Sequence, residues 1–327
     1  MRASLIEILR CPDDGRSPLV LRSPRPAAAD RIERGELECT SCHRRFPVRA
    51  GIPSLLPREL AALHLSQDPG SGRDPAVKDM LSEMSTRDQE SSVYDRLYDD
   101  RAHAFELETY KTRLAARPGE RILDVGCGTG RFTKEFTAIA GQVVGADFSM
   151  DSLCKLRERL PPDEAARVQL VQCEIGHLPL VDATFDAVVA TSLFSNVPTA
   201  ETRLAGLHEV HRVLAPGGRF LVTVYNHCWV KRARQRLGLS LAGRKQGYHS
   251  GGRIPYYNFV PAELTDWVGA LFHPGPCFGA VHRVPLLSAA SPLLARALDR
   301  LLFHVPYSLP VFAAEVGMVA HKPRDAA

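Results

Sequence analysis

Glycines and acidic residues between positions 122 and 147 have the types and the spacing to hold a nucleotide-like ligand. A short apolar run at 122–125 is followed by glycine at positions 126, 128 and 130 and by a helical pattern over 132–139. Glycine permits a positive φ and lets a ligand approach where a Cβ would block it. A strand, a glycine turn and a helix form a general arrangement for holding such a ligand at the carboxyl end of a parallel sheet.

Acidic residues follow the next two predicted strands. A strand at 142–146 ends in Asp147, where an acid can accept hydrogen bonds from both hydroxyls of a ribose. Each such charge-assisted bond contributes about 1.5–3 kcal/mol. A third strand at 168–172 precedes Glu174, and a fourth spans 185–190. A helix at 202–214 and a Pro-Gly-Gly turn at 216–218 then lead into a fifth strand at 220–225.

The glycine turn alone would fit any βα junction, but its G-x-G-x-G spacing and the ordered acids resemble class I S-adenosylmethionine (SAM)-dependent methyltransferases. The resemblance implies an α/β fold with a Rossmann-like sheet, helices on both faces and an antiparallel last strand near 316–320. It implies that Asp147 binds the ribose, and that Glu174 and the N–H of Ile175 contact the adenine. It assigns the cofactor to Asp124, Gly126, Cys127, Gly128, Thr129, Gly130, Asp147, Phe148, Glu174, Ile175 and Thr191.

Length and composition set limits on the rest. The chain has 327 residues, which suggests two domains, and its 45% hydrophobic and 24% charged residues are ordinary for a globular protein. It contains no run of 18 apolar residues and no signal-peptide pattern, so we expect a cytoplasmic protein without membrane association. A net charge of +4 is too small to indicate nucleic-acid binding by itself.

Residues 1–62 are predicted to be a small zinc-ribbon-like domain. One C-x-x-C knuckle, Cys39 to Cys42, is intact, and the other is altered to Cys11-x-x-Asp14. Zinc accepts carboxylate oxygen as well as sulfur, so these four residues could hold a structural zinc ion, with His43 as a substitute ligand. The knuckles and residues 46–57 resemble the activator subunit of tRNA, rRNA and release-factor methyltransferases. That resemblance implies docking on the methyltransferase sheet, here in cis. A metal-free ribbon held by docking alone is the alternative.

Residues 63–92 are predicted to be a linker and a leading helix, and residues 93–327 to be the methyltransferase domain. The linker is rich in Gly, Pro and Asp, and a helical pattern follows through Met80 and Met84 towards residues 94–98. In class I methyltransferases a Tyr-Asp helix of this kind often caps the SAM site. An amphipathic helix that only packs its Met and Leu side chains would give the same periodicity.

The sequence does not offer an obvious general base. Methyl transfer is an in-line displacement in which positioning can supply much of the rate, so a base is needed only if the acceptor must lose a proton. Many class I methyltransferases carry a His pair where this chain has Ser195 and Asn196, and neither is a base near neutral pH. Asn196 can still orient a ligand, and the bland alternative is a polar loop that caps the next helix.

An insertion at 226–258 is expected to cover the active site. It is rich in Lys and Arg and has no acid, and it contains His249 as a candidate base and Tyr248, Tyr256 and Tyr257 as candidate pocket residues. This composition would suit an anionic or aromatic acceptor. A solvated basic surface with core tyrosines is the alternative. Two further helices are predicted at 261–268 and 291–304.

Three functions follow from these patterns. The first is methyl transfer from SAM to a small molecule, with catalysis mainly by positioning. The second is a tRNA or rRNA methyltransferase, which the ribbon and the basic insertion suggest. The third is a non-catalytic SAM-binding or scaffold protein, suggested by the altered knuckle and the absence of an obvious base.

Overall fold

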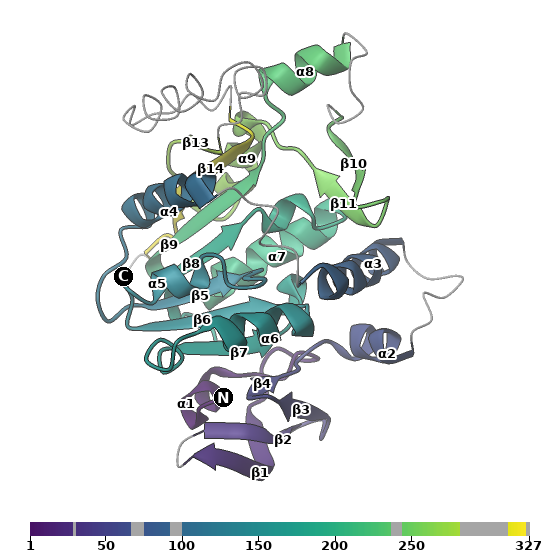
Figure 1. Ribbon diagram of the computed structural model, residues 1–327, viewed down its shortest axis with the longest axis vertical. Helices are drawn as coiled ribbons and strands as arrows, with labels where there is room; N and C mark the ends of the chain where they lie inside the picture. Colours follow the sequence, from purple (N-terminus) through teal and green to yellow (C-terminus); the bar gives the residue numbers. More distant parts are fainter. Residues whose placement is uncertain (29–30, 67–74, 92–99, 237–243, 282–312, 325–327) are drawn as a thin grey trace.

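The computed structural model describes residues 1–28, 31–66, 75–91, 100–236, 244–281 and 313–324. A small β-rich domain lies at one end of the molecule, a large sheet with its helices occupies the middle, and the described parts of the segment 226–258 lie towards the other end (Figure 1). Within the described ranges no helix is both long and apolar enough to cross a bilayer.

The N-terminal domain is a short helix packed on a twisted antiparallel sheet. Strand β3 alternates exposed and buried residues, so that Phe46 and Val48 enter the core while their neighbours face water. The strands pair in the order β1-β2-β3-β4. The elements of this domain are α1 (Ala3–Ile8), β1 (Leu19–Ala28), β2 (Arg31–Cys39), β3 (Arg45–Arg49) and β4 (Ile52–Pro53).

The large sheet is mixed and mostly parallel, in agreement with the predicted Rossmann-like fold. Its strands run β12-β14-β9-β8-β5-β6-β7, with β13 beside β14. Strands β5 to β9 pair in parallel, and β14 pairs antiparallel with β9, which confirms the predicted last strand. The strands are β5 (Arg121–Val125), β6 (Gln142–Asp147), β7 (Val168–Gln172), β8 (Phe185–Thr191), β9 (Leu214–Tyr225), β12 (His273–Pro274), β13 (Phe278–Val281) and β14 (Glu315–His321).

Helices cover both faces of this sheet, as the α/β prediction required. Along β8, Val188 and Ala190 belong to one apolar core, whereas Ala187 and Val189 belong to the other, because successive side chains of a strand point to opposite faces. One face packs against α7 (Ala200–Val213) and α9 (Pro261–Gly269), which begins at its proline as predicted. The other face packs against α4 (Asp100–Leu114), α5 (Thr133–Phe136) and α6 (Met150–Arg159). Helix α5 is shorter than the predicted 132–139, since residues 137–141 form turns.

The N-terminal domain contacts the β7 side of the large sheet. The backbone N–H of Leu55 donates to Gln172 O at 2.8 Å, next to a parallel bridge between Ser54 and Gln172. A second contact joins residues 8–10 to residues 179–181. Arg10 N donates to Pro179 O at 2.9 Å, and Val181 N donates to Ile8 O at 2.9 Å. The two contacts flank residues 173–178 before and after, so the N-terminal domain holds both ends of the segment that contains Glu174.

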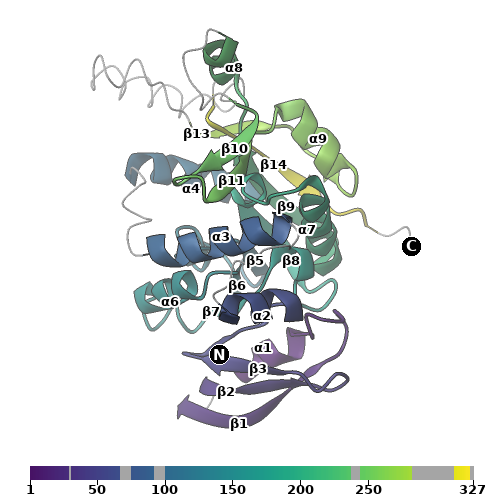
Figure 2. The same ribbon diagram turned by 90° about the vertical axis from the view of Figure 1, so that its right-hand side faces the viewer.

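The segment predicted as a linker and leading helix contains two helices. Helix α2 (Arg58–Ser66) continues from the N-terminal domain, and α3 (Pro75–Glu90) lies across the carboxyl ends of the sheet strands, beside α6 and β11 (Figure 2). The leading helix is therefore present, but the Tyr-Asp segment at 94–98 lies outside the described residues. The predicted helix at 291–304 lies outside them as well.

The insertion at 226–258 forms helix α8 (Trp229–Arg236) and a hairpin of β10 (Gln246–His249) and β11 (Ile254–Tyr257). The hairpin lies against α3. Two hydrogen bonds join them: Tyr248 Oη donates to Asp79 at 2.9 Å, and Arg253 donates to Gln89 at 3.2 Å. It therefore rests on the helix that covers the sheet edge, rather than directly on the glycine loop.

We predict that Gln172 couples the two domains energetically. Its Oε1 accepts from Ser54 Oγ at 2.5 Å, and its Nε2 donates to Phe148 O at 2.9 Å. Gln172→Leu would leave the Ser54 hydroxyl and the Phe148 carbonyl without these hydrogen bonds. We therefore expect the free energy of unfolding to fall by about 1–3 kcal/mol in urea denaturation. Ser54→Ala removes one of the two bonds and should cost less. Equal stability of Gln172→Leu and wild type would contradict this coupling.

Candidate functional site

The glycine loop turns sharply between β5 and α5 and lies against the end of β6. Gly126, Gly128 and Gly130 have φ values of 70°, 53° and 86°, which side chains other than glycine rarely adopt. Gly126 N and Cys127 N both donate to Ala146 O, at 2.7 and 3.2 Å. The loop is thus fastened to the neighbouring strand, as a ligand-holding turn at the carboxyl end of a parallel sheet requires.

Asp147 ends β6 beside this loop and is 7% exposed. Its Oδ2 accepts from Gly128 N at 2.8 Å, and its Oδ1 accepts from Ser149 N at 2.9 Å. Burial raises the pKa of the carboxyl, and the two backbone N–H groups act in the opposite direction. Because a carboxylate oxygen can accept more than one hydrogen bond, both oxygens retain capacity for a ligand's hydroxyl groups.

Asp124, the predicted acid within β5, is held by the helix that follows the loop. Its Oδ2 accepts from Thr133 Oγ1 at 2.6 Å, and burial raises its pKa to about 7. The bond fixes the orientation of the start of α5 relative to β5. Asp124 therefore supports the loop from inside the protein while one side of it faces a cavity.

A first cavity, of about 520 Å³, has mostly apolar walls and contains the predicted adenine-binding residues. Ile175 and Leu178 line it together with Leu193 and Val197, and Glu174 lies at its wall. Glu174 is 6% exposed and lies 3.1 Å from Nδ1 of His177, and that hydrogen bond raises the pKa of His177. A mostly apolar hollow with the Glu174 carboxylate at its wall suits an aromatic base that bears an amino group.

A second cavity, of about 860 Å³, is more polar and lies over the glycine loop. The predicted cofactor residues that line it are Asp124, Gly126, Cys127, Gly128, Thr129, Asp147, Phe148 and Thr191. Gly126, Asp147 and Phe148 line both cavities, so the two hollows meet at Asp147.

Sequence reasoning missed several residues that line the second cavity. Tyr110 comes from α4, Arg131 from the glycine turn and Glu315 from the start of β14. Because β14 is antiparallel, its first residue lies at the same sheet edge as the ends of β8 and β9. Only the predicted direction of that strand could have indicated Glu315.

Ser192 and Glu315 form a polar pair at this edge. Ser192 has a φ of 56°, a conformation that is unusual for a residue with a side chain and often occurs at functional sites. It is held there because Ser192 N donates to Thr223 O at 2.9 Å and Ser192 Oγ donates to Glu315 Oε2 at 2.8 Å. The pair places a hydroxyl and a carboxylate on the wall of the second cavity.

The three candidate catalytic residues have different positions. Asn196 lines the second cavity, whereas neither His249 nor Tyr248 lines either of the two cavities that the described residues form. The side-chain amide of Asn196 satisfies its hydrogen bonds when its nitrogen faces His249. In this orientation the nitrogen donates to His249 Nε2 at 3.2 Å, and the amide oxygen accepts from Arg87 at 3.3 Å. Burial, followed by the Arg87 charge, lowers the pKa of His249. Tyr248 is 54% exposed.

The other pocket candidates of the insertion also point elsewhere. Tyr257 Oη bonds to Glu263, and Lys245 forms an ion pair with Glu263 at 3.2 Å. Lys231 donates to Asn258, and Arg253 approaches Glu90 at 4.0 Å. Lys231, Lys245 and Arg253 therefore contact residues outside the cavities, and no described residue of the insertion lines either cavity, which differs from the expectation of a basic acceptor pocket.

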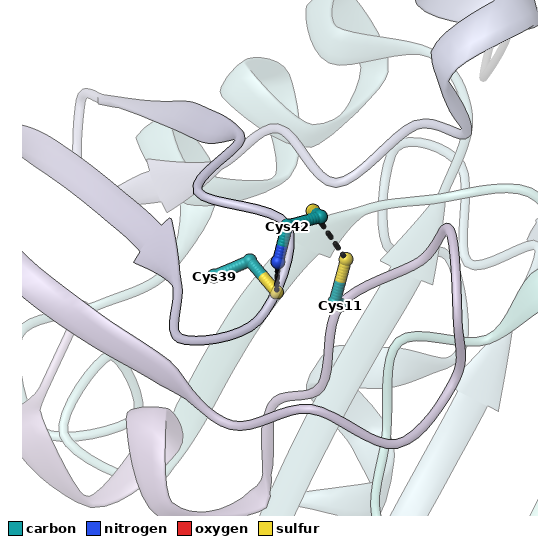
Figure 3. Close-up of side chains that lie close together, drawn as sticks. All are labelled: Cys11, Cys39 and Cys42. Carbon is teal, nitrogen blue, oxygen red and sulfur yellow. Dashed lines mark hydrogen bonds between the residues drawn. The ribbon is translucent and has the colours of Figure 1, made fainter.

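The N-terminal domain brings three of its four predicted metal ligands together. The sulfur atoms of Cys11, Cys39 and Cys42 all lie within 4.8 Å of one another, and Cys11 faces the Cys39–Cys42 turn (Figure 3). The Cys11 and Cys42 sulfurs are 3.8 Å apart, which matches the edge of about 3.8 Å of a tetrahedron with Zn–S bonds of about 2.3 Å. Two backbone N–H groups also point at Cys39 Sγ, each at 3.4 Å.

The structure does not bring Asp14 into this cluster. Its carboxylate accepts from Arg16 N, Ser17 N and Ser17 Oγ, at 2.6–2.9 Å, and these bonds lower its pKa. His43, the substitute ligand, lies with Nδ1 3.7 Å from Glu38. The donors placed to hold a zinc ion are thus the three sulfurs. The structure differs from the predicted four-ligand set, because Asp14 is not among them.

Comparison with known proteins finds a different family in each of two parts of the chain. Residues 122–218 match a methyltransferase domain family, and residues 2–51 match the Trm112p-like family. This chain contains a methyltransferase domain preceded by a Trm112p-like domain. Its fold is similar to a complex between the Haloferax volcanii Trm112 methyltransferase activator and a methyltransferase, with a TM-score of 0.51, 17% identity, and 74% of this chain and 96% of that chain covered.

Curated relatives of the methyltransferase domain include quinone-modifying enzymes. A demethylmenaquinone methyltransferase of Clavibacter sepedonicus is 38% identical over 143 residues, which are 42% of this chain and 56% of that protein. A ubiquinone/menaquinone biosynthesis C-methyltransferase of Ectopseudomonas mendocina is 41% identical over 34% of this chain and 43% of that protein. The chain spans about half the length of the curated relatives that it matches.

We predict that Gly130 is required for the loop to fit against α6. A Cβ at this position would lie 2.0 Å from Leu156 Cδ1, in addition to the strain of a φ of 86°. Gly130→Ala should lower the free energy of unfolding by about 2 kcal/mol or more, measured by urea denaturation. Gly119→Ala is the matched control, because Gly119 has a φ of 90° but nothing within 4 Å of the added carbon. If both variants lost the same stability, the packing argument would be wrong.

Proposed function

We propose that this protein transfers the methyl group of SAM to a small-molecule acceptor. The observation that carries the proposal is the pair of cavities that meet at Asp147. An apolar slot with Glu174 suits the adenine, the carboxylate at the junction suits the ribose diol, and the polar second cavity suits the methionine portion. This arrangement follows the extended shape of SAM from one end to the other.

The acceptor would enter the second cavity near Ser192 and Glu315. In the reaction, a lone pair of the acceptor forms a bond to the methyl carbon while the C–S bond breaks, which leaves S-adenosylhomocysteine (SAH). A proton released by the acceptor can pass to the Glu315 carboxylate, which already accepts from Ser192 Oγ at 2.8 Å. Holding the two reactants in line supplies most of the rate acceleration.

A small acceptor is favoured over RNA by the walls of this cavity and by the relatives. Lys231, Lys245 and Arg253 of the insertion contact protein groups outside the cavity, and none of the described residues of the insertion lines the second cavity. The curated relatives are a demethylmenaquinone methyltransferase and a methyltransferase of ubiquinone and menaquinone biosynthesis, and their names indicate small-molecule acceptors. A tRNA or rRNA acceptor, which the Trm112p-like match suggests, and a non-catalytic SAM-binding role are the other outcomes that the following experiment distinguishes.

The test follows radiolabel from methyl-labelled SAM into a small-molecule extract and into bulk RNA. We expect label in the extract, with a loss of at least tenfold in Asp147→Ala, because the ribose loses its carboxylate partner. Calorimetry with SAM provides the binding constant for both proteins. Label in RNA alone would favour the RNA methyltransferase, and SAM binding without transfer to either pool would favour the non-catalytic role. Absence of SAM binding by the wild type would overturn the whole proposal.

We further propose that the Trm112p-like domain serves as a built-in activator that docks in cis and holds a zinc ion. The hydrogen bonds of Leu55 and Arg10 to the segments around Glu174 support the first part, and the sulfur cluster supports the second. Zinc would be held by Cys11, Cys39 and Cys42 and would cross-link the two loops of the domain. Small domains commonly need such a cross-link, since their cores contribute little stability.

Elemental analysis of the purified protein tests the metal. We expect about one zinc per chain in the wild type, and loss of zinc with a lower melting temperature in Cys39→Ser. Asp14→Ala is the control that should retain zinc, because the Asp14 carboxylate is held by Ser17 and not by the sulfurs. A wild type without stoichiometric zinc would leave the ribbon metal-free, and loss of zinc in Asp14→Ala would restore the original four-ligand set.

A further inference from the structure

Helix α3 forms a wall of both cavities and is held in place by three sets of contacts. Its Met84 is fully buried against Leu56 and Leu60, in a cluster that also includes Phe148. Its Asp88 accepts from Ser149 Oγ at 2.5 Å, at the beginning of α6. The β10–β11 hairpin contacts α3 through Tyr248 and Arg253, which donate to Asp79 and Gln89 of the helix. The helix therefore has a defined position opposite the end of β6, where Asp147 lies.

Glu83 is the acidic side chain that this helix directs towards the cavities. It is 8% exposed and lines both cavities, as Asp147 does. Its Oε1 accepts from Arg87 at 3.3 Å. Burial, only partly offset by Arg87, raises the pKa of Glu83 to about 7, and the charge of Asp147 contributes to the increase. A buried carboxyl placed so close to a second one is costly unless a ligand donates hydrogen bonds to it.

We propose that Glu83 is a second ribose-binding carboxylate, which contacts the cofactor from the side opposite to Asp147. This inference rests on the proposed SAM-dependent function and adds a residue that the matched domain, residues 122–218, does not contain. A ribose offers two hydroxyl donors, and the two carboxyl groups approach that position from β6 and from α3. The cofactor would thus join α3 to the sheet.

The assignment to the ribose follows from the order of groups in SAM. The adenine occupies the first cavity beside Glu174, the methionine portion occupies the second, and the ribose lies between them. Glu83 and Asp147 line both hollows and therefore lie at their junction. Arg87 can remain paired with Glu83 while the carboxylate accepts from a hydroxyl, because each oxygen accepts more than one bond.

Calorimetry of the full-length protein with SAM and with SAH tests this role. Glu83→Leu removes the acceptor atoms, and we expect about tenfold or greater loss of affinity for both ligands, because both carry the ribose. Glu83→Gln keeps one acceptor oxygen and should lose less. Glu90→Leu is the matched control on the same helix, with its side chain outside the cavities, and should bind as the wild type does. Melting curves establish that each variant is folded.

The outcomes separate this inference from the proposed function. Wild type that binds neither ligand would overturn the function and the inference together. If the wild type binds SAM and SAH and Glu83→Leu binds them with the same affinity, the inference alone is overturned. A loss confined to SAM would also overturn it, because SAM and SAH differ in the charge of the sulfur and share the ribose, and Glu83 would then be a partner of the sulfonium.

Discussion

The buried carboxylate of Asp147 is the interaction on which the rest of the site depends. It can remain inside the protein only because Gly128 N and Ser149 N donate to its two oxygens. The first donor requires the left-handed glycine loop, and the second requires the start of α6 immediately after β6. Loop, strand and helix are thus fixed relative to one another around one acid, and the two cavities are the space that remains beside it.

Much of this arrangement could be predicted because it depends on local sequence. Glycines with positive φ, acids at strand ends and short apolar runs are features of single segments, and parallel strands bring their carboxyl ends to one edge. The sheet, the antiparallel last strand, and the positions of Asp124, Asp147, Glu174 and Thr191 at the cavities followed from them. The cysteine pair at 39 and 42 and its approach to Cys11 were predictable in the same way.

The remaining features depend on contacts between distant segments, which spacing does not reveal. Glu83 and Glu315 are far apart in sequence, and each meets the cavities only through the path of α3 or the direction of β14. The basic composition of 226–258 suggested a charged pocket, but three of its cations, Lys231, Lys245 and Arg253, contact Asn258, Glu263 and Glu90 instead. Asp14 had the right spacing for a ligand, and the local turn at Ser17 competes for its carboxylate.

The covalent connection between β4 and α3 has a consequence for how the two domains stay together. In a complex of separate chains, the contact around Gln172 would have to overcome the loss of translational and rotational freedom on association. In the proposed cis arrangement, the covalent link would hold the N-terminal domain near the β7 edge at an effective concentration of the order of millimolar. Dilution would therefore not separate them, and the interface, which combines backbone hydrogen bonds, the Gln172 amide and apolar side chains of both domains in one core, need not overcome that loss.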